Sequence, residues 1–184
     1  WVVTNTATGM AAITWTLMAW AHTGKPSIVG AASGAVAGLV AITPASGFVG
    51  PMASIIIGIA AGTICYGCVA FKNARKWDDA LDVWGVHGMG GFAGAVLTGT
   101  LASPHIWDAG GTGTGAWTGT PEGYEQQAIN IIGACISVGY AFGVTVIILK
   151  VMDAVWPGGI RVTPKEEEIG LDLAQHGERA YVNE

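Results

Sequence analysis

One histidine lies inside a long apolar stretch of the sequence, and its chemistry gives the first indication of function. His87 belongs to Trp84-Gly-Val-His-Gly-Met-Gly-Gly-Phe92, a run without aspartate, glutamate, lysine or arginine. A neutral imidazole both donates and accepts a hydrogen bond, and it titrates near neutral pH. It can therefore line a narrow path for a small polar substrate or take a proton from it. The alternative is a hydrogen bond between helices. Ionisable residues at membrane depth generally mark functional sites, which favours the pore interpretation.

The residues next to His87 fit a narrow path through packed helices. Val83 lies one helical turn before it, on the same face. Small residues let helices approach closely, and their missing side chains leave room beside the imidazole. The glycines of this stretch are Gly85, Gly88, Gly90, Gly91 and Gly94.

Three carboxylates precede this stretch, namely Asp78, Asp79 and Asp82. Negative charge near the first turn of a helix interacts favourably with the helix dipole. We expect Asp78 to cap the helix. We expect Asp79 and Asp82 to be structural or to form the mouth of the pore.

Thr43-Pro44 is a second irregular point within an apolar stretch. Proline removes a backbone hydrogen bond and can break a helix. The Thr43 hydroxyl and the freed carbonyls either face the pathway or bond a neighbouring helix.

The elements that carry these residues are predicted to be membrane-spanning helices. Of 184 residues, 51% are hydrophobic and 11% charged, against about 25% charged in a soluble domain. The mean hydropathy is +0.49. A span needs roughly 20 apolar residues, and such blocks occur near residues 2–21, 28–47, 52–71, 83–102 and 127–155. The predicted fold is an all-α polytopic membrane protein in the lipid bilayer, with a transmembrane region over 1–162 and a tail over 163–184.

Charge predicts the orientation of these spans. All eight lysines and arginines fall on one side of a five-span topology, at Lys25, within 72–76, or from Lys150 onward. The positive-inside rule then places the tail in the cytoplasm and the first residue outside, in a cell (inner or plasma) membrane. The Cys65–Cys68 pair lies in an apolar block and is interpreted as two small hydrophobes. We expect no enzyme activity, metal, cofactor or nucleic-acid partner.

Three segments resemble the Amt branch of the ammonium transporter family, the Amt/Mep/Rh superfamily. Residues 24–47, GKPSIVGAASGAVAGLVAITPASG, are similar to its GKPS and ITPA stretch. Residues 78–91, DDALDVWGVHGMGG, are similar to its DD..DVFGVHG element. Residues 168–181, EIGLDLAQHGERAY, are similar to its EGLD and HGE.AY tail. The motifs are in the family's order and cover nearly the whole chain.

The resemblance implies an eleven-helix fold of two inverted halves, assembled as a homotrimer with a pore in each subunit. This chain would supply helices seven to eleven and the cytoplasmic tail. His87 matches the second of the family's twin pore histidines. Val83 and Trp84 match positions near the cytoplasmic side of the pore, where Trp84 replaces the more usual phenylalanine. Asp79 matches the acidic position before that helix, and Thr43 the threonine before the family's proline.

The resemblance also implies the activity. Ammonium would be deprotonated at an outer site and cross as ammonia, with or without a coupled proton, along a narrow hydrophobic path, and methylammonium would serve as an analogue. The outer site, the phenylalanine gate and the first histidine have no counterpart here, so we expect the chain to be part of a larger protein. The tail would bind PII-type regulatory proteins or tie subunits together, through Leu171, Asp172, His176, Gly177 and Tyr181. The alternatives are an Amt-like ammonium sensor, a Rh-type gas channel, or another transporter in which these spans are scaffold.

Overall fold

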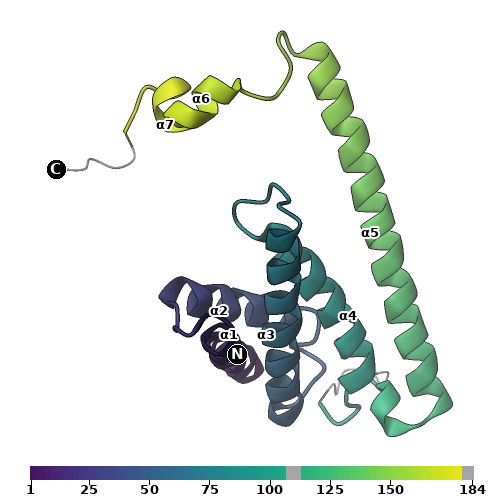
Figure 1. The fold of residues 1–184 in the computed structure, drawn as a ribbon. Helices are drawn as coiled ribbons and strands as arrows, with labels where there is room; N and C mark the ends of the chain where they lie inside the picture. The colour runs from purple at the N-terminus through teal and green to yellow at the C-terminus, as the bar shows by residue number, and fades with distance from the viewer. Residues whose placement is uncertain (107–112, 180–184) are drawn as a thin grey trace. The chain divides into compact units, whose positions relative to one another are not determined.

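The computed structural model describes residues 1–106 and 113–179, which are helical with no strand among them (Figure 1). The chain divides into two compact units, Trp1–Ile136 and Ser137–Glu184, and each is described by itself. The long helices are α1 (Val2–Thr23), α2 (Ile28–Ile42), α3 (Pro51–Ala74), α4 (Met89–Leu101) and α5 (Pro121–Val155). A π-helical turn, η1 (Trp84–Gly88), leads into α4, and a 3₁₀ turn, η2 (Ala116–Thr118), precedes α5. The tail holds α6 (Pro164–Ile169) and α7 (Leu171–Ala174).

Glycine, serine and proline set the ends of the first helices. Gly24 ends α1 in the left-handed region, with φ of 78°, and its amide donates to the Trp20 carbonyl. This conformation is unstrained only for glycine. The Ser27 hydroxyl accepts the Gly30 amide at 3.1 Å and so caps α2. Pro51 begins α3, where its missing N–H costs nothing.

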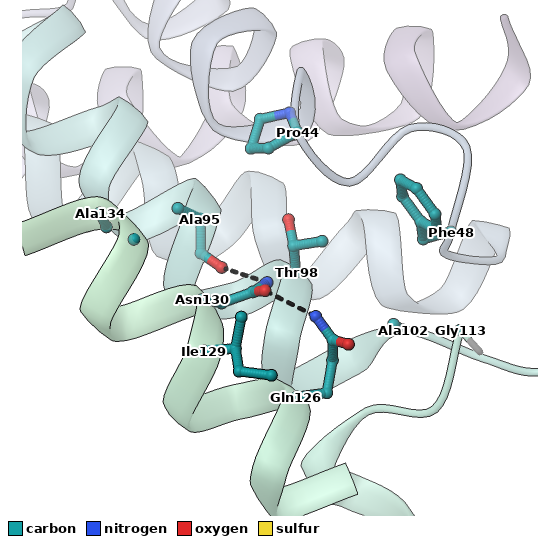
Figure 2. Close-up of a pocket in the computed structure, with 11 residues that line it drawn as sticks. Pro44, Phe48, Ala95, Thr98, Ala102, Gly113, Gln126, Ile129, Asn130 and Ala134 are labelled. Carbon is teal, nitrogen blue, oxygen red and sulfur yellow. Dashed lines mark hydrogen bonds between the residues drawn. The ribbon is translucent and has the colours of Figure 1, made fainter. Parts of the chain in front are cut away.

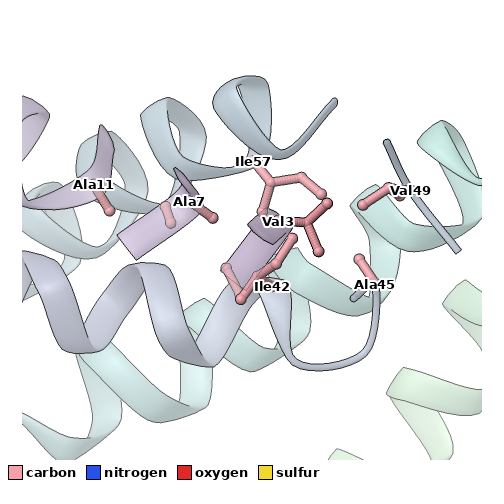
Figure 3. Packing of buried hydrophobic residues seen from close by; sticks show 9 residues of the cluster. Val3, Ala7, Ala11, Ile42, Ala45, Val49 and Ile57 are labelled. Atoms are coloured by element: carbon pink, nitrogen blue, oxygen red, sulfur yellow. The ribbon is translucent and has the colours of Figure 1, made fainter. Parts of the chain in front are cut away.

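Helix α1 is packed closely against both α2 and α3. A Cβ at Gly38 of α2 would lie 2.6 Å from the Ala7 carbonyl oxygen, and one at Gly58 of α3 would lie 2.5 Å from the same oxygen. Both helices therefore approach the α1 backbone at this level, which only glycine permits. The apolar cluster around this contact is shown in Figure 3 and consists of Val3, Ala7, Ala11, Ala41, Ile42, Ala45, Val49, Ile57 and Ala61.

Among the described residues, two helices are long and apolar enough to cross a membrane, α3 with 24 residues and α5 with 35. The apolar helix α2 is shorter, with 15 residues. Residues 28–47 were expected to form one span, but α2 ends at Ile42. It ends there because Pro44 follows and residues 43–48 form turns. The interpretation of α1, α2 and η1–α4 as further spans stays a prediction.

The tail of the second unit is partly helical. The Thr163 hydroxyl accepts the Glu166 amide at 3.3 Å, and the Glu166 carboxylate accepts the Thr163 amide at 2.9 Å, which together form a capping box that starts α6. The pKa of Glu166 is lowered mainly by the hydrogen bond from the Thr163 hydroxyl and further by the bond from the Thr163 amide. The bonds that the Glu166 carboxylate accepts therefore contribute fully above the usual pKa of a glutamate and are lost as the pH falls through the lower folded value.

Candidate functional site

His87 lies in a widened helical turn. In η1 the Met89 amide donates to the Trp84 carbonyl, five residues back, in place of the usual four. Such π turns are rare and occur frequently at functional sites. The sequence pattern around His87 gave no signal for this geometry. The turn places the candidate histidine at a backbone irregularity within unit 1.

The expected pathway residues of this turn share an exposed face. Val83 is 48% exposed and Trp84 37% exposed, and His87 is also exposed. In contrast, the intervening Gly85 and Val86 are buried. We call the exposed surface of Val83, Trp84 and His87 the histidine face; Trp77 and Phe71 of unit 1 contact the Trp84 ring at its edge.

The glycines of this segment divide between two roles. A Cβ at Gly85 would lie 2.7 Å from Val69 Cγ2 of α3. A Cβ at Gly94 would collide with the Ala41 carbonyl oxygen of α2. These glycines permit close packing away from the histidine face. At Gly88 the nearest atom to an added Cβ is Trp84 Cδ1, at 3.8 Å, so this position next to His87 has free space.

Asp79 holds the start of the histidine-bearing helix. Its carboxylate oxygens accept the amides of Val83 and Trp84, each at 2.9 Å. Free amides of a first turn need such acceptors. We expected this role of Asp78, but the two bonds are made by Asp79. The pKa of Asp79 is lowered mainly by the hydrogen bond from the Trp84 amide. The bond from the Val83 amide and the charge of Lys72 lower it further.

Lys72 ties the end of α3 to the same segment. Its Nζ donates to the Asp79 carbonyl oxygen and to Asp82 Oδ1, both at 2.6 Å. The Lys72 side chain is 6% exposed and that of Asp82 31% exposed. Asp82 has a φ of 56°, a left-handed conformation that aspartate tolerates better than most residues. Sequence reasoning missed Lys72 and counted it only as a cytoplasmic charge.

Replacing Asp79 with alanine is expected to destabilise the folded protein by about 1 kcal/mol, because the first-turn amides lose their acceptors. Asp79→Asn should recover part of this loss, since its amide oxygen still accepts a hydrogen bond. The lowered pKa of Asp79 gives the sign of the pH dependence. The cap contributes fully above the usual pKa of an aspartate and is lost as the pH falls through the lower folded value. Unfolding of the whole protein in detergent, followed against pH, checks both effects. Equal stability of Asp79→Ala and the parent would contradict the capping role.

Three aromatic rings surround the start of η1. The Trp77 and Trp84 ring centroids are 5.2 Å apart, those of Phe71 and Trp77 5.7 Å, and those of Phe71 and Trp84 6.4 Å. The Arg75 guanidinium lies 5.2 Å from the Phe71 centroid. We call Phe71, Trp77 and Trp84 the aromatic cluster. Sequence reasoning identified only Trp84 of this set.

The Thr43 hydroxyl bonds within its own helix and not to a neighbouring one. It donates to the Leu39 carbonyl oxygen at 2.7 Å. The side chain is exposed at the end of α2. Its assignment to the pathway remains a prediction without a contact that supports it.

A pocket of about 540 Å³ lies within unit 1 between α4, the first part of α5 and the turn that follows α2 (Figure 2). Pro44 and Phe48 line it from the turn. Asn130 donates to the Ala95 carbonyl oxygen at 3.3 Å and accepts from Gln126 at 2.8 Å. Asn130 ties α5 to α4, and Gln126 supports it from within α5. Sequence reasoning missed both, although Asn130, a polar residue inside an expected span, was a signal.

The expected regulatory residues lie in and after α7, within unit 2. Leu171 is 45% exposed, and His176 and Gly177 are exposed. The Glu178 amide donates to the Asp172 carbonyl oxygen at 2.9 Å, closing a turn around them. Tyr181 lies outside the described residues.

Comparison with known proteins gives one consistent family. The model of the Ammonium Transporter Family matches residues 1–181. An ammonium transporter of Aquifex aeolicus is 47% identical over 184 residues, which cover 98% of this chain and 41% of the relative. The crystal structure of Candida albicans Mep2 superposes with a TM-score of 0.82 at 41% identity, covering 95% of this chain and 38% of that one. A structure described as a sensor Amt protein superposes with a TM-score of 0.77 at 26% identity, covering 95% and 40%.

The family match extends over the histidine face, the aromatic cluster and most of the tail. The chain spans less than half the length of the curated relatives that it matches, 44%, 41% and 43% for three of them. Members of this family are membrane transporters rather than enzymes. With the family model matched over 181 residues and a relative at 47% identity, the chain belongs to the ammonium transporter family.

Proposed function

We propose that the whole protein carries ammonium, as ammonia, across a membrane through a narrow hydrophobic pore, and that His87 is the second of two histidines lining it. The observation that carries this proposal is the exposed position of His87 on a π turn, on one face with Val83 and Trp84. An imidazole on an exposed face of an apolar segment needs polar partners from elsewhere in the protein. The part of the relatives that lies beyond this chain has room to supply them.

The chemistry of the histidine face suits ammonia better than a hydrated ion. A neutral imidazole can accept a hydrogen bond from ammonia at one nitrogen and donate at the other. Val83 offers an ion no polar group, and the Trp84 ring replaces only part of an ion's hydration, so a charged species there pays a desolvation cost. Deprotonation before this point, at an outer site, removes that cost.

The membrane arrangement is part of the same proposal. Residues 1–162 form five spans of an eleven-helix, two-half fold, with the first residue outside and residues 163–184 in the cytoplasm. All eight lysines and arginines fall on the same side of the five predicted spans, which supports this orientation. The protein would act as a homotrimer in the inner or plasma membrane and serve nitrogen uptake.

An ammonium sensor is the second candidate, because a protein described as a sensor Amt shares the fold of this chain at 26% identity. In that case the histidine face would bind ammonium or ammonia and change conformation with little flux. A Rh-type gas channel is less favoured by the Amt-like segments at 24–47 and 168–181.

Measurements on the whole protein in proteoliposomes separate these functions. We expect uptake of ammonium and methylammonium, with no current or uptake for potassium. Ammonium binding without flux would favour the sensor. Uptake that follows only the ammonia concentration as pH varies would favour the gas channel. Potassium transport at a similar rate would contradict the proposal.

The tail is proposed as a regulatory element that a PII-type protein contacts through Leu171, Asp172, His176, Gly177 and Tyr181. Exposed side chains around α7 support this role. Deletion of the residues after Thr163 should change uptake or abolish its inhibition by such a protein. Unchanged uptake and inhibition would leave the tail as a purely structural element.

A further inference from the structure

Trp84 is held at both its backbone and its ring. Its amide donates to Asp79 Oδ2 at 2.9 Å. Its ring packs against Trp77 with centroids 5.2 Å apart and planes at 76°, an edge-to-face contact. Such aromatic pairs contribute beyond the area that they bury. The ring of an exposed pathway residue therefore has a defined neighbour.

Trp77 is itself fixed from the α3 side. Its ring meets Phe71 edge to face, with centroids 5.7 Å apart and planes at 89°. The Arg75 guanidinium lies 5.2 Å from the Phe71 centroid. The Trp77 amide also donates to the Lys72 carbonyl oxygen at 3.3 Å. The contacts run from the end of α3 through Trp77 to Trp84.

We propose that Trp77 is a positioning residue that fixes the Trp84 ring at the start of the helix that carries His87 and so sets which amines pass the inner end of the pathway. This inference rests on the proposed function and extends it to size selectivity. Trp77 is 50% exposed and lies outside the expected span, before the helix that carries His87. It would act only through Trp84, without contacting the substrate.

Loss of Trp77 would free the Trp84 ring more than it would move its backbone. The two Asp79 bonds and the Lys72–Asp82 pair are independent of the Trp77 side chain. Without its edge-to-face neighbour Trp77, the Trp84 ring would sample further rotamers. It would then obstruct the passage of a bulky amine less. Ammonia is small enough to pass in either case, so the effect should depend on the size of the amine.

The test is the ratio of methylammonium to ammonium uptake by the whole protein in proteoliposomes, measured for Trp77→Ala and Trp77→Phe. Because the ratio comes from one preparation, a smaller folded fraction cancels. We expect Trp77→Ala to raise the ratio about two- to tenfold, as the loss of one aromatic pair would. We expect Trp77→Phe, which keeps a ring, to restore most of it. Trp20→Ala, a half-exposed tryptophan on α1, is the matched control.

A ratio of methylammonium to ammonium uptake equal to that of the parent would overturn the proposal, even if Trp77→Ala lowered both uptakes. Trp84→Ala and His87→Ala keep this failure distinct from failure of the proposed function. If those two variants alter transport and Trp77→Ala does not, the positioning role alone is wrong. If none of the three alters transport, the pathway assignment is wrong as well.

Discussion

Replacing His87 with alanine in the whole protein is expected to lower methylammonium uptake about tenfold or to change its ion selectivity. A buried polar substrate that loses one hydrogen-bonding partner loses roughly 1–3 kcal/mol, and 1.4 kcal/mol corresponds to a factor of ten. The variant also removes the bulk of the imidazole from the exposed face that it shares with Val83 and Trp84. Admission of potassium would show this second effect.

His105→Ala is the matched control for this variant. His105 is an exposed histidine in the turn after α4, and it is not part of the proposed pathway. We expect its uptake and selectivity to equal those of the parent. If His87→Ala, folded and inserted, also behaves as the parent, then His87 is a structural residue only.

Replacing Lys72 with alanine is expected to lower the free energy of unfolding by about 2–3 kcal/mol. Removing one partner of a buried ion pair typically costs 3–5 kcal/mol, because the remaining charge stays desolvated. Asp82 is 31% exposed, so water screens part of this cost. The variant also loses the bond to the Asp79 carbonyl oxygen and with it a tie between α3 and the start of η1. Transport should fall as well, because the segment that leads into the histidine face is no longer held to α3 by Lys72.

Two further variants give this prediction its controls. Lys25→Ala removes an exposed lysine outside any ion pair among the described contacts, and it should leave stability unchanged within a few tenths of a kcal/mol. Lys72→Met combined with Asp82→Asn removes both charges together and should be more stable than Lys72→Ala. Unfolding in detergent measures all three. A Lys72→Ala protein as stable as the parent would contradict the account of the ion pair.

The sequence singled out His87 and Val83 as candidates, and their role in a pathway stays a prediction. A lone ionisable residue among glycines in an apolar run is the signal, since such a group is costly at membrane depth. Periodicity alone placed Val83 on the same face, and both residues are exposed in the structure. The breaks near Gly24 and Pro51 were equally readable, because glycine and proline have strong backbone preferences.

What the sequence could not give depends on contacts between distant residues. The π turn at Trp84–Gly88 has no local sequence signature, so only the backbone bonds reveal it. Lys72 resembled any cytoplasmic lysine, and its burial follows from the way the chain folds back to place Asp82 beside it. Asp79, and not its neighbour Asp78, accepts the two first-turn amides, and the left-handed residue Asp82 lies between it and those amides, a chain path that local sequence does not specify. The role proposed for Trp77 follows only from the contact between its ring and the Trp84 ring.

The central claim is that the histidine face lines the substrate pathway, and cysteine accessibility at Val83 tests it most directly. The experiment uses the whole protein with Cys65, Cys68 and Cys135 replaced by alanine, provided that uptake persists. In that background we predict that a small neutral thiol reagent stops methylammonium uptake by Val83→Cys and that ammonium slows the modification. His105→Cys, exposed in the turn after α4 and outside the proposed pathway, should be modified without loss of uptake. Modification of Val83→Cys with unchanged uptake, or at a rate that ammonium does not affect, would contradict the claim.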